Sequence, residues 1–509
     1  MTAPERLSVV LAVSTLTLLG CTTGMVGGCA GLVAGLLTLV VPWYRQPLWA
    51  WAALYLRRSR GMVLSPPSTA ANDHSAGGVR YQDGVAAVAV HILGRAYAPT
   101  VLTVSNSTRT TNVLDIGRLI PLLDQSLGLK LDSISVISTG YRRSDNGDYA
   151  AVYDTLIGTP PYAGVRETWL VVRMRGLPNA DALRFRNSVG SAAVAVAQRI
   201  TADLRRQGLR ARVASATEML GFEKNIGGSD LDTRHRKWRS VRADAGWLAT
   251  YAYQPADTTT EALSQAWALR ADAVTSNITV FPDSTVTATL TVRSARPPAE
   301  PPNSRLLTLP GEQTEAIAAA MCAARPQLRR VPRGEIPESL VMPIGPSGIL
   351  IGKTEGAERL LIPLASPGRH TRVHIAAGDA IAKRLIIRAA AAGDRIALHT
   401  RDIRRWERLR MPNIVVVDHA RPVPGTTVSV VDGTILPATR TNTTLVVAPR
   451  GTSPSGPVDV AITQLSPSMV SISTAGITTD VEVELFRAEN RYVTTEAERA
   501  VLTELEPAQ

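Results

Sequence analysis

Cysteine is scarce in this chain, which has three among its 509 residues. Cys21 and Cys29 fall in an apolar N-terminal run, and Cys322 stands alone in the rest of the sequence. The polar part of the chain therefore has no pair of cysteines for an intrachain disulfide, and no cysteine cluster with the spacing of a zinc site. This usage is typical of a protein that faces a reducing compartment.

Lysine is also scarce, because only five of the 55 basic residues are lysines and the others are arginines. With 43 acidic residues the formal net charge is +12. A basic chain has two usual partners, nucleic acid and the anionic inner surface of a membrane. No nucleic-acid-binding signature accompanies the charge, so we predict membrane lipids and no nucleic acid as partners.

Charged residues are absent from residues 7–43. As one helix this run would be about 56 Å long, whereas the hydrocarbon core of a bilayer is roughly 30 Å thick. A break near Thr22, Thr23 and Gly24 divides it into two helices, at about residues 5–22 and 24–41, each just long enough to cross. The sequence therefore predicts a transmembrane hairpin over residues 5–43, from which the rest of the chain hangs.

Arginines flank this apolar run on both sides. Arg6 precedes it, and Arg45, Arg57, Arg58 and Arg60 follow it, whereas the predicted turn carries no charge. Basic residues beside a span remain on the cytoplasmic side of the membrane. The sequence thus predicts a multi-pass protein whose soluble domains are cytoplasmic.

An aromatic segment follows the predicted hairpin. Residues 47–60, which begin PLWAWAALYL, are too short to span and suit an amphipathic helix along the inner membrane surface. Tryptophan and tyrosine are enriched at the membrane–water interface. The predicted interfacial anchor consists of Trp43, Tyr44, Trp49, Trp51, Tyr55, Arg57 and Arg58.

Glycines recur at four-residue spacing in the second predicted helix, at Gly27, Gly31 and Gly35. Small residues at this spacing form a ridge that lets another helix come close. We predict helix packing along this ridge. The sequence leaves open whether the partner is the first helix or another protein.

The run Leu18-Leu19-Gly20-Cys21 offers a competing interpretation, because it looks like a lipoprotein processing site. Lipidation there would put everything downstream outside the membrane. Only one basic residue precedes the run, however, and lipidation of Cys21 would leave the second apolar stretch unexplained. That second stretch also argues against a cleaved signal peptide. An exported lipoprotein therefore remains an alternative.

Two folded units are predicted after a tether at residues 61–78, which is rich in proline, serine and glycine. Residues 79–295 mix hairpins, strands and an Ala-rich helix, which indicates an α+β domain. Residues 294–304 hold four prolines and predict a linker. Residues 305–509 alternate strands and helices in the manner of a parallel α/β sheet. The predicted fold class is a membrane-anchored α/β protein.

The strand–loop–helix that begins at Val373 has the layout of a phosphate-binding loop but lacks its residues. Such a loop needs several glycines, so that backbone N–H groups converge on the phosphates, and a lysine that follows a glycine. Here only Gly378 is present, and Lys383 has no preceding glycine. We therefore predict neither a functional phosphate loop nor a bound cofactor.

Asp230 and Asp232 resemble the paired carboxylates that hold a divalent metal and a nucleotide-sugar diphosphate. Two acids at this spacing are common by chance, and the basic run after them could neutralise their charge. A membrane-bound, glycosyltransferase-like enzyme remains a second alternative. We predict no metal site and no catalytic residue.

The histidines do not change this prediction. His370 and His374 are four apart but lie in an alternating, strand-like run, so they need not share a face as metal ligands would. The pair Asp418-His419 has no serine or cysteine nucleophile to complete a triad. The stretches at 234–242 and 401–410 interleave tryptophan with arginine, which suits docking to acidic partners or lipid head groups. A solvated surface explains them equally well.

Taken in order, these features resemble the EccE family of type VII (ESX) secretion systems of high-GC Gram-positive bacteria. The resemblance covers about residues 5–295, and the C-terminal unit matches less specifically. It rests on the N-terminal hairpin, the aromatic segment before Arg57-Arg58, GVRYQDG at 78–84, ETWLVVRMRGLPNADAL at 167–183, GLRARVASATEM at 208–219 and VTATLTVR at 286–293.

The resemblance implies a non-catalytic structural subunit of an inner-membrane translocation complex. It implies partners named EccB, EccC and EccD, of which EccC supplies the ATPase. It further implies a cytosolic domain likened to a glycosyltransferase fold without the metal-binding chemistry, and a location in the bacterial inner (plasma) membrane.

Overall fold

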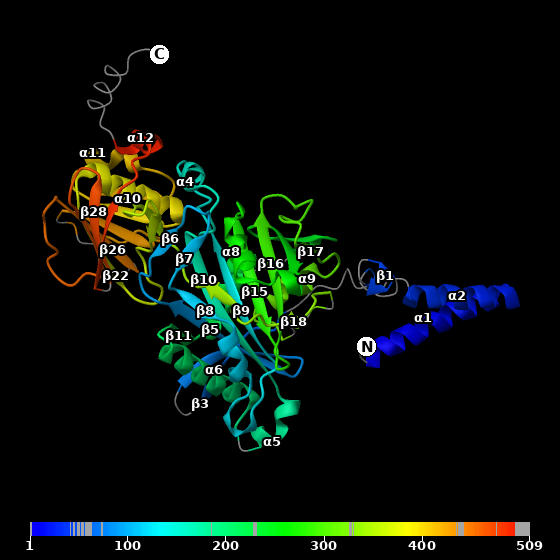
Figure 1. Ribbon diagram of the computed structural model, residues 1–509. Helices are drawn as coiled ribbons and strands as arrows, with labels where there is room; N and C mark the ends of the chain where they lie inside the picture. Colours follow the sequence, from blue (N-terminus) through cyan, green and yellow to red (C-terminus); the bar gives the residue numbers. More distant parts are fainter. Residues whose placement is uncertain are drawn as a thin grey trace, which may run out of the picture.

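Two N-terminal helices stand apart from a body built on two large β-sheets in the computed structural model (Figure 1). The protein thus has the mixed α/β fold predicted from its sequence. The structure describes residues 3–40, 42–43, 46–47, 51, 55, 64–72, 75–184, 186–227, 232–324, 328, 330–433, 435, 442–474 and 476–493.

The N-terminal helices are α1 (Ala3–Cys21) and α2 (Met25–Val40), which a turn at residues 22–24 separates. Gly24 in this turn has φ +100°, a backbone conformation that favours glycine. The two-residue strands β1 (Pro42–Trp43) and β2 (Gln46–Pro47) pair with each other after α2. Among the described helices, none combines the length and the apolar character that crossing a membrane requires.

The first sheet is antiparallel, with β12-β13-β14-β16-β15-β9-β10-β5-β4-β3 as its main path; β11, β17 and β18 pair with β5, β14 and β16. Its strands are β3 (Ser68–Asn72), β4 (Ser75–Gln82), β5 (Val85–Gly94), β9 (Ser133–Tyr141), β10 (Val165–Arg175), β11 (Arg210–Val213), β12 (Asp232–Lys237), β13 (Ser240–Ala243), β14 (Gly246–Tyr253), β15 (Ala273–Val280), β16 (Thr285–Ser294), β17 (Leu306–Thr308) and β18 (Gly334–Glu335).

Both faces of the first sheet are covered, which explains why β5 is buried along its whole length. Alternate residues of a strand face opposite sides. Val88 and Val90 join the core under α6 (Val189–Arg206), whereas Ala87 and Ala89 join a second core beneath α7 (Ala216–Gly227) and α9 (Gln313–Ala319). Helix α6 begins at a capping box formed by Ser188 and Ser191, and its alanine-rich face lets it approach the sheet closely.

The second sheet has the order β24-β23-β25-β26-β22-β27-β28-β29-β20-β21-β6-β7, and its strands from β24 to β27 are parallel. The strands are β6 (Thr100–Leu102), β7 (Thr108–Thr110), β20 (Ile349–Lys353), β21 (Arg359–Ile362), β22 (Thr371–Ala376), β23 (Ile396–His399), β24 (Ile414–Val417), β25 (Val428–Asp432), β26 (Thr443–Ala448), β27 (Val460–Gln464), β28 (Met469–Thr474) and β29 (Ile477–Glu482).

Helix α10 (Asp379–Ala392) is buried from Ile381 onward, and it packs against β20, α4 (Ala150–Ile157) and α12 (Asn490–Val493). Strand β8 (Val113–Asp115) pairs with β19 (Val341–Pro343) beside the two sheets. The remaining short helices are α5 (Ala180–Leu183), α8 (Thr260–Gln265) and α11 (Ile403–Trp406), with 3-10 turns at Gly117–Leu123, Ser126–Gly128, Leu177–Asn179, Pro255–Asp257, Ala266–Ala268, Glu407–Leu409 and Arg487–Glu489.

The structure differs from the predicted division of the chain in three places. Much of the predicted tether at 61–78 is strand, because β3 and the start of β4 extend the first sheet. The proline-rich stretch at 294–304 leads back into that sheet through β17, so it does not separate the two sheets. Conversely, β6 and β7 belong to the second sheet although they come from the first predicted domain. Prolines stop a strand, but they do not decide which sheet the chain joins next.

Candidate functional sites

The glycines at four-residue spacing face α1 in this structure. A Cβ built on Gly31 would lie 2.4 Å from the carbonyl oxygen of Leu16, and one on Gly35 would lie 3.3 Å from the Cα of Val13. At Gly27 the nearest atoms would be the Thr23 hydroxyl and the Gly20 carbonyl oxygen. The close contacts at Gly31 and Gly35 involve backbone of α1, which cannot rotate away as a side chain can.

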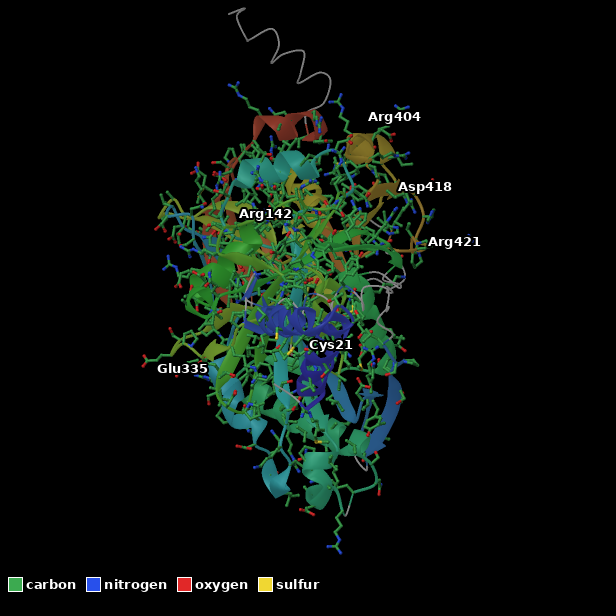
Figure 2. All side chains as sticks on the ribbon, turned by 90° about the vertical axis from the view of Figure 1, so that its right-hand side faces the viewer. Cys21, Arg142, Glu335, Arg404, Asp418 and Arg421 are labelled. Atoms are coloured by element: carbon green, nitrogen blue, oxygen red, sulfur yellow. The ribbon has the colours of Figure 1, made fainter. Side chains whose placement is uncertain are left out.

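The outer faces of the hairpin expose apolar side chains. A contiguous exposed apolar surface marks a site of contact with lipid or another protein. The exposed residues include Val10, Leu16, Leu18, Leu19, Met25, Val26, Leu32, Val33 and Leu36. In Figure 2, which views the body from the hairpin side, the end of α1 with Cys21 lies in front of the body. The hairpin that carries this apolar surface therefore lies outside the body of the two sheets (Figure 1).

Trp51 connects the predicted interfacial segment with the folded body. Its ring lies 5.8 Å from the ring of Trp238, in the turn between β12 and β13, and the Arg330 guanidinium lies 4.5 Å from the centre of the Trp51 ring. Tyr55 is exposed. The side chain of Trp43 and all of Tyr44, Trp49, Arg57 and Arg58 lie outside the described residues, as do most of the predicted helix at 47–60 and Asp230.

The position of the predicted degenerate phosphate loop is filled by the protein's own side chains. The backbone N–H of Gly378 donates to Gln464 Oε1 at 2.8 Å. Arg405 bridges the carboxylates of Asp379 and Asp432, and its hydrogen bonds lower the pKa of Asp379. Lys383 contacts the same carboxylate at 3.4 Å. An ionised carboxylate occupies the start of α10, where a phosphate cradle would need open N–H groups.

The candidate histidines and the second arginine-rich stretch contain both buried and exposed residues. His374 is buried on β22, whereas His370 is exposed; His399 Nδ1 lies 2.8 Å from the carbonyl oxygen of His419. No group of three metal-binding side chains occurs among the described residues. Trp406 is completely buried and bonds Asp432, so the tryptophan of 401–410 belongs to the core; Arg404 and Arg421 lie at the edge of the body in Figure 2.

Buried arginines are a feature that sequence reasoning missed. Arg80 pairs with Glu223, Arg142 with Asp154, and Arg384 and Arg388 with Glu489. Arg173 instead donates to the carbonyl oxygens of Ala319, Met321 and Ala323 around the end of α9. The partners are as many as 150 residues away in the sequence, so no local pattern identifies them.

These features define an α/β protein that carries an apolar helical hairpin at its N-terminus and uses its buried charges to join distant segments. The comparison with known proteins is more specific. Residues 162–253 match the family described as "Putative type VII ESX secretion system translocon, EccE".

Relatives extend this match over nearly the whole chain. ESX-2 secretion system protein EccE2 of Mycobacterium tuberculosis (strain CDC 1551 / Oshkosh) is 45% identical over 93% of this chain and 92% of its own length. ESX-1 secretion system protein EccE1 of the same strain is 26% identical over 72% of this chain and 75% of its own length. ESX-5 secretion system protein EccE5 of Mycobacterium marinum is 30% identical over 22% of this chain and 28% of its own length.

The chain belongs to the EccE family, which confirms the resemblance read from its sequence. Members of this family are components of type VII (ESX) secretion systems. The comparisons give no support to a glycosyltransferase-like enzyme or an exported lipoprotein.

Proposed function

We propose that this chain is a non-catalytic structural subunit of a type VII (ESX) secretion complex in the bacterial inner membrane. The similarity to ESX-2 secretion system protein EccE2 over 93% of the chain is the observation that supports this most strongly. The filled phosphate-loop position also favours a structural role, because Arg405 already pairs with Asp379 there and Gln464 accepts from the Gly378 N–H.

In this proposal the α1–α2 hairpin lies in the membrane and the body lies in the cytoplasm. The exposed apolar side chains and the flanking arginines support this arrangement. Helices of 19 and 16 residues are about 28 and 24 Å long. Both are shorter than an average hydrocarbon core, so the hairpin would require local thinning of the bilayer.

The proposed partners are EccB, EccC and EccD. Because the glycines at 27, 31 and 35 face α1, partner helices would contact the outer faces of the hairpin, where Leu32, Val33 and Leu36 are exposed. Trp51 and Trp238 would attach the segment that follows the hairpin to the body.

The decisive experiment is gentle purification of the tagged full chain from its native membranes, followed by mass measurement of the recovered particle. We expect co-elution with EccB, EccC and EccD in one large assembly. Leu36→Arg should reduce their recovery, because it places a charge on the apolar intramembrane face that is proposed to contact the partner helices. A control substitution of the same type at the exposed turn residue Ser284 should leave recovery unchanged. A lone monomer that resists cross-linking to any of the three would overturn the proposal.

A further inference from the structure

A cavity of about 180 Å³ lies at the junction of the two sheets, where β7, β10, α8 and the segment before β20 meet. Its lining is mainly apolar, with several hydroxyl side chains and a buried arginine among the apolar groups. The residues that matter for its chemistry are Thr108, Arg166, Thr260, Ser264, Trp267 and Ser347. Arg109, exposed and paired with Glu358, lies beside them.

Arg166 is the charged group of this cavity, and it is 4% exposed. Its Nε donates to the carbonyl oxygen of Gly345 at 2.6 Å, and its guanidinium lies 4.8 Å from the centre of the Trp267 ring. Within the described part of the chain, Nη1 and Nη2 have no hydrogen-bond acceptor, and no carboxylate lies within ion-pair distance.

The other buried arginines of the body are satisfied differently. Arg80, Arg142, Arg384 and Arg388 each face a carboxylate, and Arg173 is surrounded by carbonyl oxygens. Arg166 has neither arrangement among the described residues. A second donor beside it, Trp267 Nε1, is buried and finds no acceptor there.

Burial lowers the pKa of Arg166 to about 9, and no acidic group raises it. The side chain is therefore still protonated at neutral pH and carries a positive charge inside the protein. A buried charge without a partner is unfavourable, and an anion with oxygen acceptors relieves that cost. Guanidinium groups bind carboxylate and phosphate through two parallel N–H···O bonds.

We infer that this cavity binds a small oxyanion, a phosphate or a carboxylate group, through Nη1 and Nη2 of Arg166, with the hydroxyl group of Ser264 in the same lining. The cavity joins segments from both sheets, so an anion bound there stabilises their junction. This inference does not depend on the proposed secretion role.

The test is thermal unfolding of the full chain in detergent at pH 7, with sodium phosphate or sodium acetate titrated against chloride at constant ionic strength. We expect phosphate or acetate at ten times its dissociation constant to raise the melting temperature by about 1.5 °C. The anion that acts at the lower concentration identifies the ligand class. Arg166→Gln should abolish the shift.

Two further variants separate binding from folding. Ser264→Leu fills the cavity while Arg166 itself is unchanged, so this variant should abolish the shift. Ser471 is a half-buried serine on β28, and Ser471→Leu should retain the shift. If Arg166→Gln does not fold, the comparison of the two leucine variants decides. No shift with either anion in the wild-type chain, or an equal shift in Ser264→Leu, would overturn the inference.

Discussion

At the scale of single residues, buried arginine–carboxylate pairs join parts of the body that are far apart in the chain. Arg388 is completely buried, donates to Glu489 at 2.7 Å and also bonds the carbonyl oxygens of Leu350 and Ile351. Glu489 additionally accepts from the Tyr149 hydroxyl. The Glu489 carboxylate therefore accepts from donors on α10 and beside α4, and Arg388 in turn donates to two carbonyl oxygens of β20.

Removing that carboxylate should be strongly destabilising. In Glu489→Gln the Arg388 charge remains buried without its counterion, and we expect the free energy of unfolding to fall by about 3–5 kcal/mol. Urea unfolding of the detergent-solubilised chain, followed by circular dichroism, measures the change. Glu358→Gln, which breaks the exposed pair with Arg109, should cost less than about 1 kcal/mol. Equal effects of the two substitutions would show that the buried pair does not stabilise the fold.

At the scale of elements, α1 and α2 pack closely because glycine, which has no side chain, occupies positions 31 and 35 of α2. We call this contact the seam between α1 and α2. The Cβ of Val13 lies 3.6 Å from the position that a Cβ on Gly35 would occupy, which is within the range for a disulfide. A leucine at residue 31 would collide with the Leu16 carbonyl oxygen. The helices would then have to separate by the width of a side chain.

This predicts a cross-link that reports on the seam. With Cys21 and Cys29 replaced by serine, Val13→Cys together with Gly35→Cys should oxidise to an intramolecular disulfide, detected by mass spectrometry of the linking peptide. Adding Gly31→Leu should reduce its yield at least several-fold, whereas Ala34→Leu, on the exposed side of α2, should not. A disulfide that forms equally well in the Gly31→Leu background would contradict the tight seam.

Local sequence signals succeeded for the elements that carry their own pattern. ETWLVVRMR predicted β10, and the alanine-rich run predicted α6. In both cases the residues that become buried lie close together in the sequence, so a local pattern reveals them. The glycine spacing predicted a close approach but not its partner, since nothing in α2 distinguishes α1 from a foreign helix. Arg166 resembled any other arginine in a strand. Its cavity depends on Thr260 and Ser347, which only the folded topology brings beside it.

At the scale of the whole molecule, each of the two sheets includes strands from the part of the sequence that mainly forms the other sheet. Strands β6 and β7 complete the second sheet, and β17, α9 and β18 complete the first. The Gln313 side chain on α9 bonds both the N–H and the carbonyl oxygen of Thr250. Neither sheet is made from one continuous half of the sequence, so the predicted linker at 294–304 does not join independent domains.

Cutting the chain within 294–304 should therefore leave one particle. We expect that a protease site inserted between Pro298 and Pro301 can be cleaved, since this stretch has no strand or helix, and that both fragments then co-elute in size-exclusion chromatography. They should separate only when urea unfolds the body. Separation of the fragments under native conditions would show that the exchanged segments contribute little.

Because the sheets contain segments from distant parts of the sequence, the body can close only after its later segments have been synthesised. The hydrogen bond between Tyr149 and Glu489 joins residues 340 positions apart. At about 5–20 residues per second, Tyr149 waits roughly 20–70 seconds before its partner is made. The apolar hairpin precedes the body in the sequence, so it is synthesised long before the body can close. A nascent chain held at a membrane by that hairpin would have its unfinished sheets kept apart from those of other chains, which gives the N-terminal position of the hairpin a use in folding as well as in assembly.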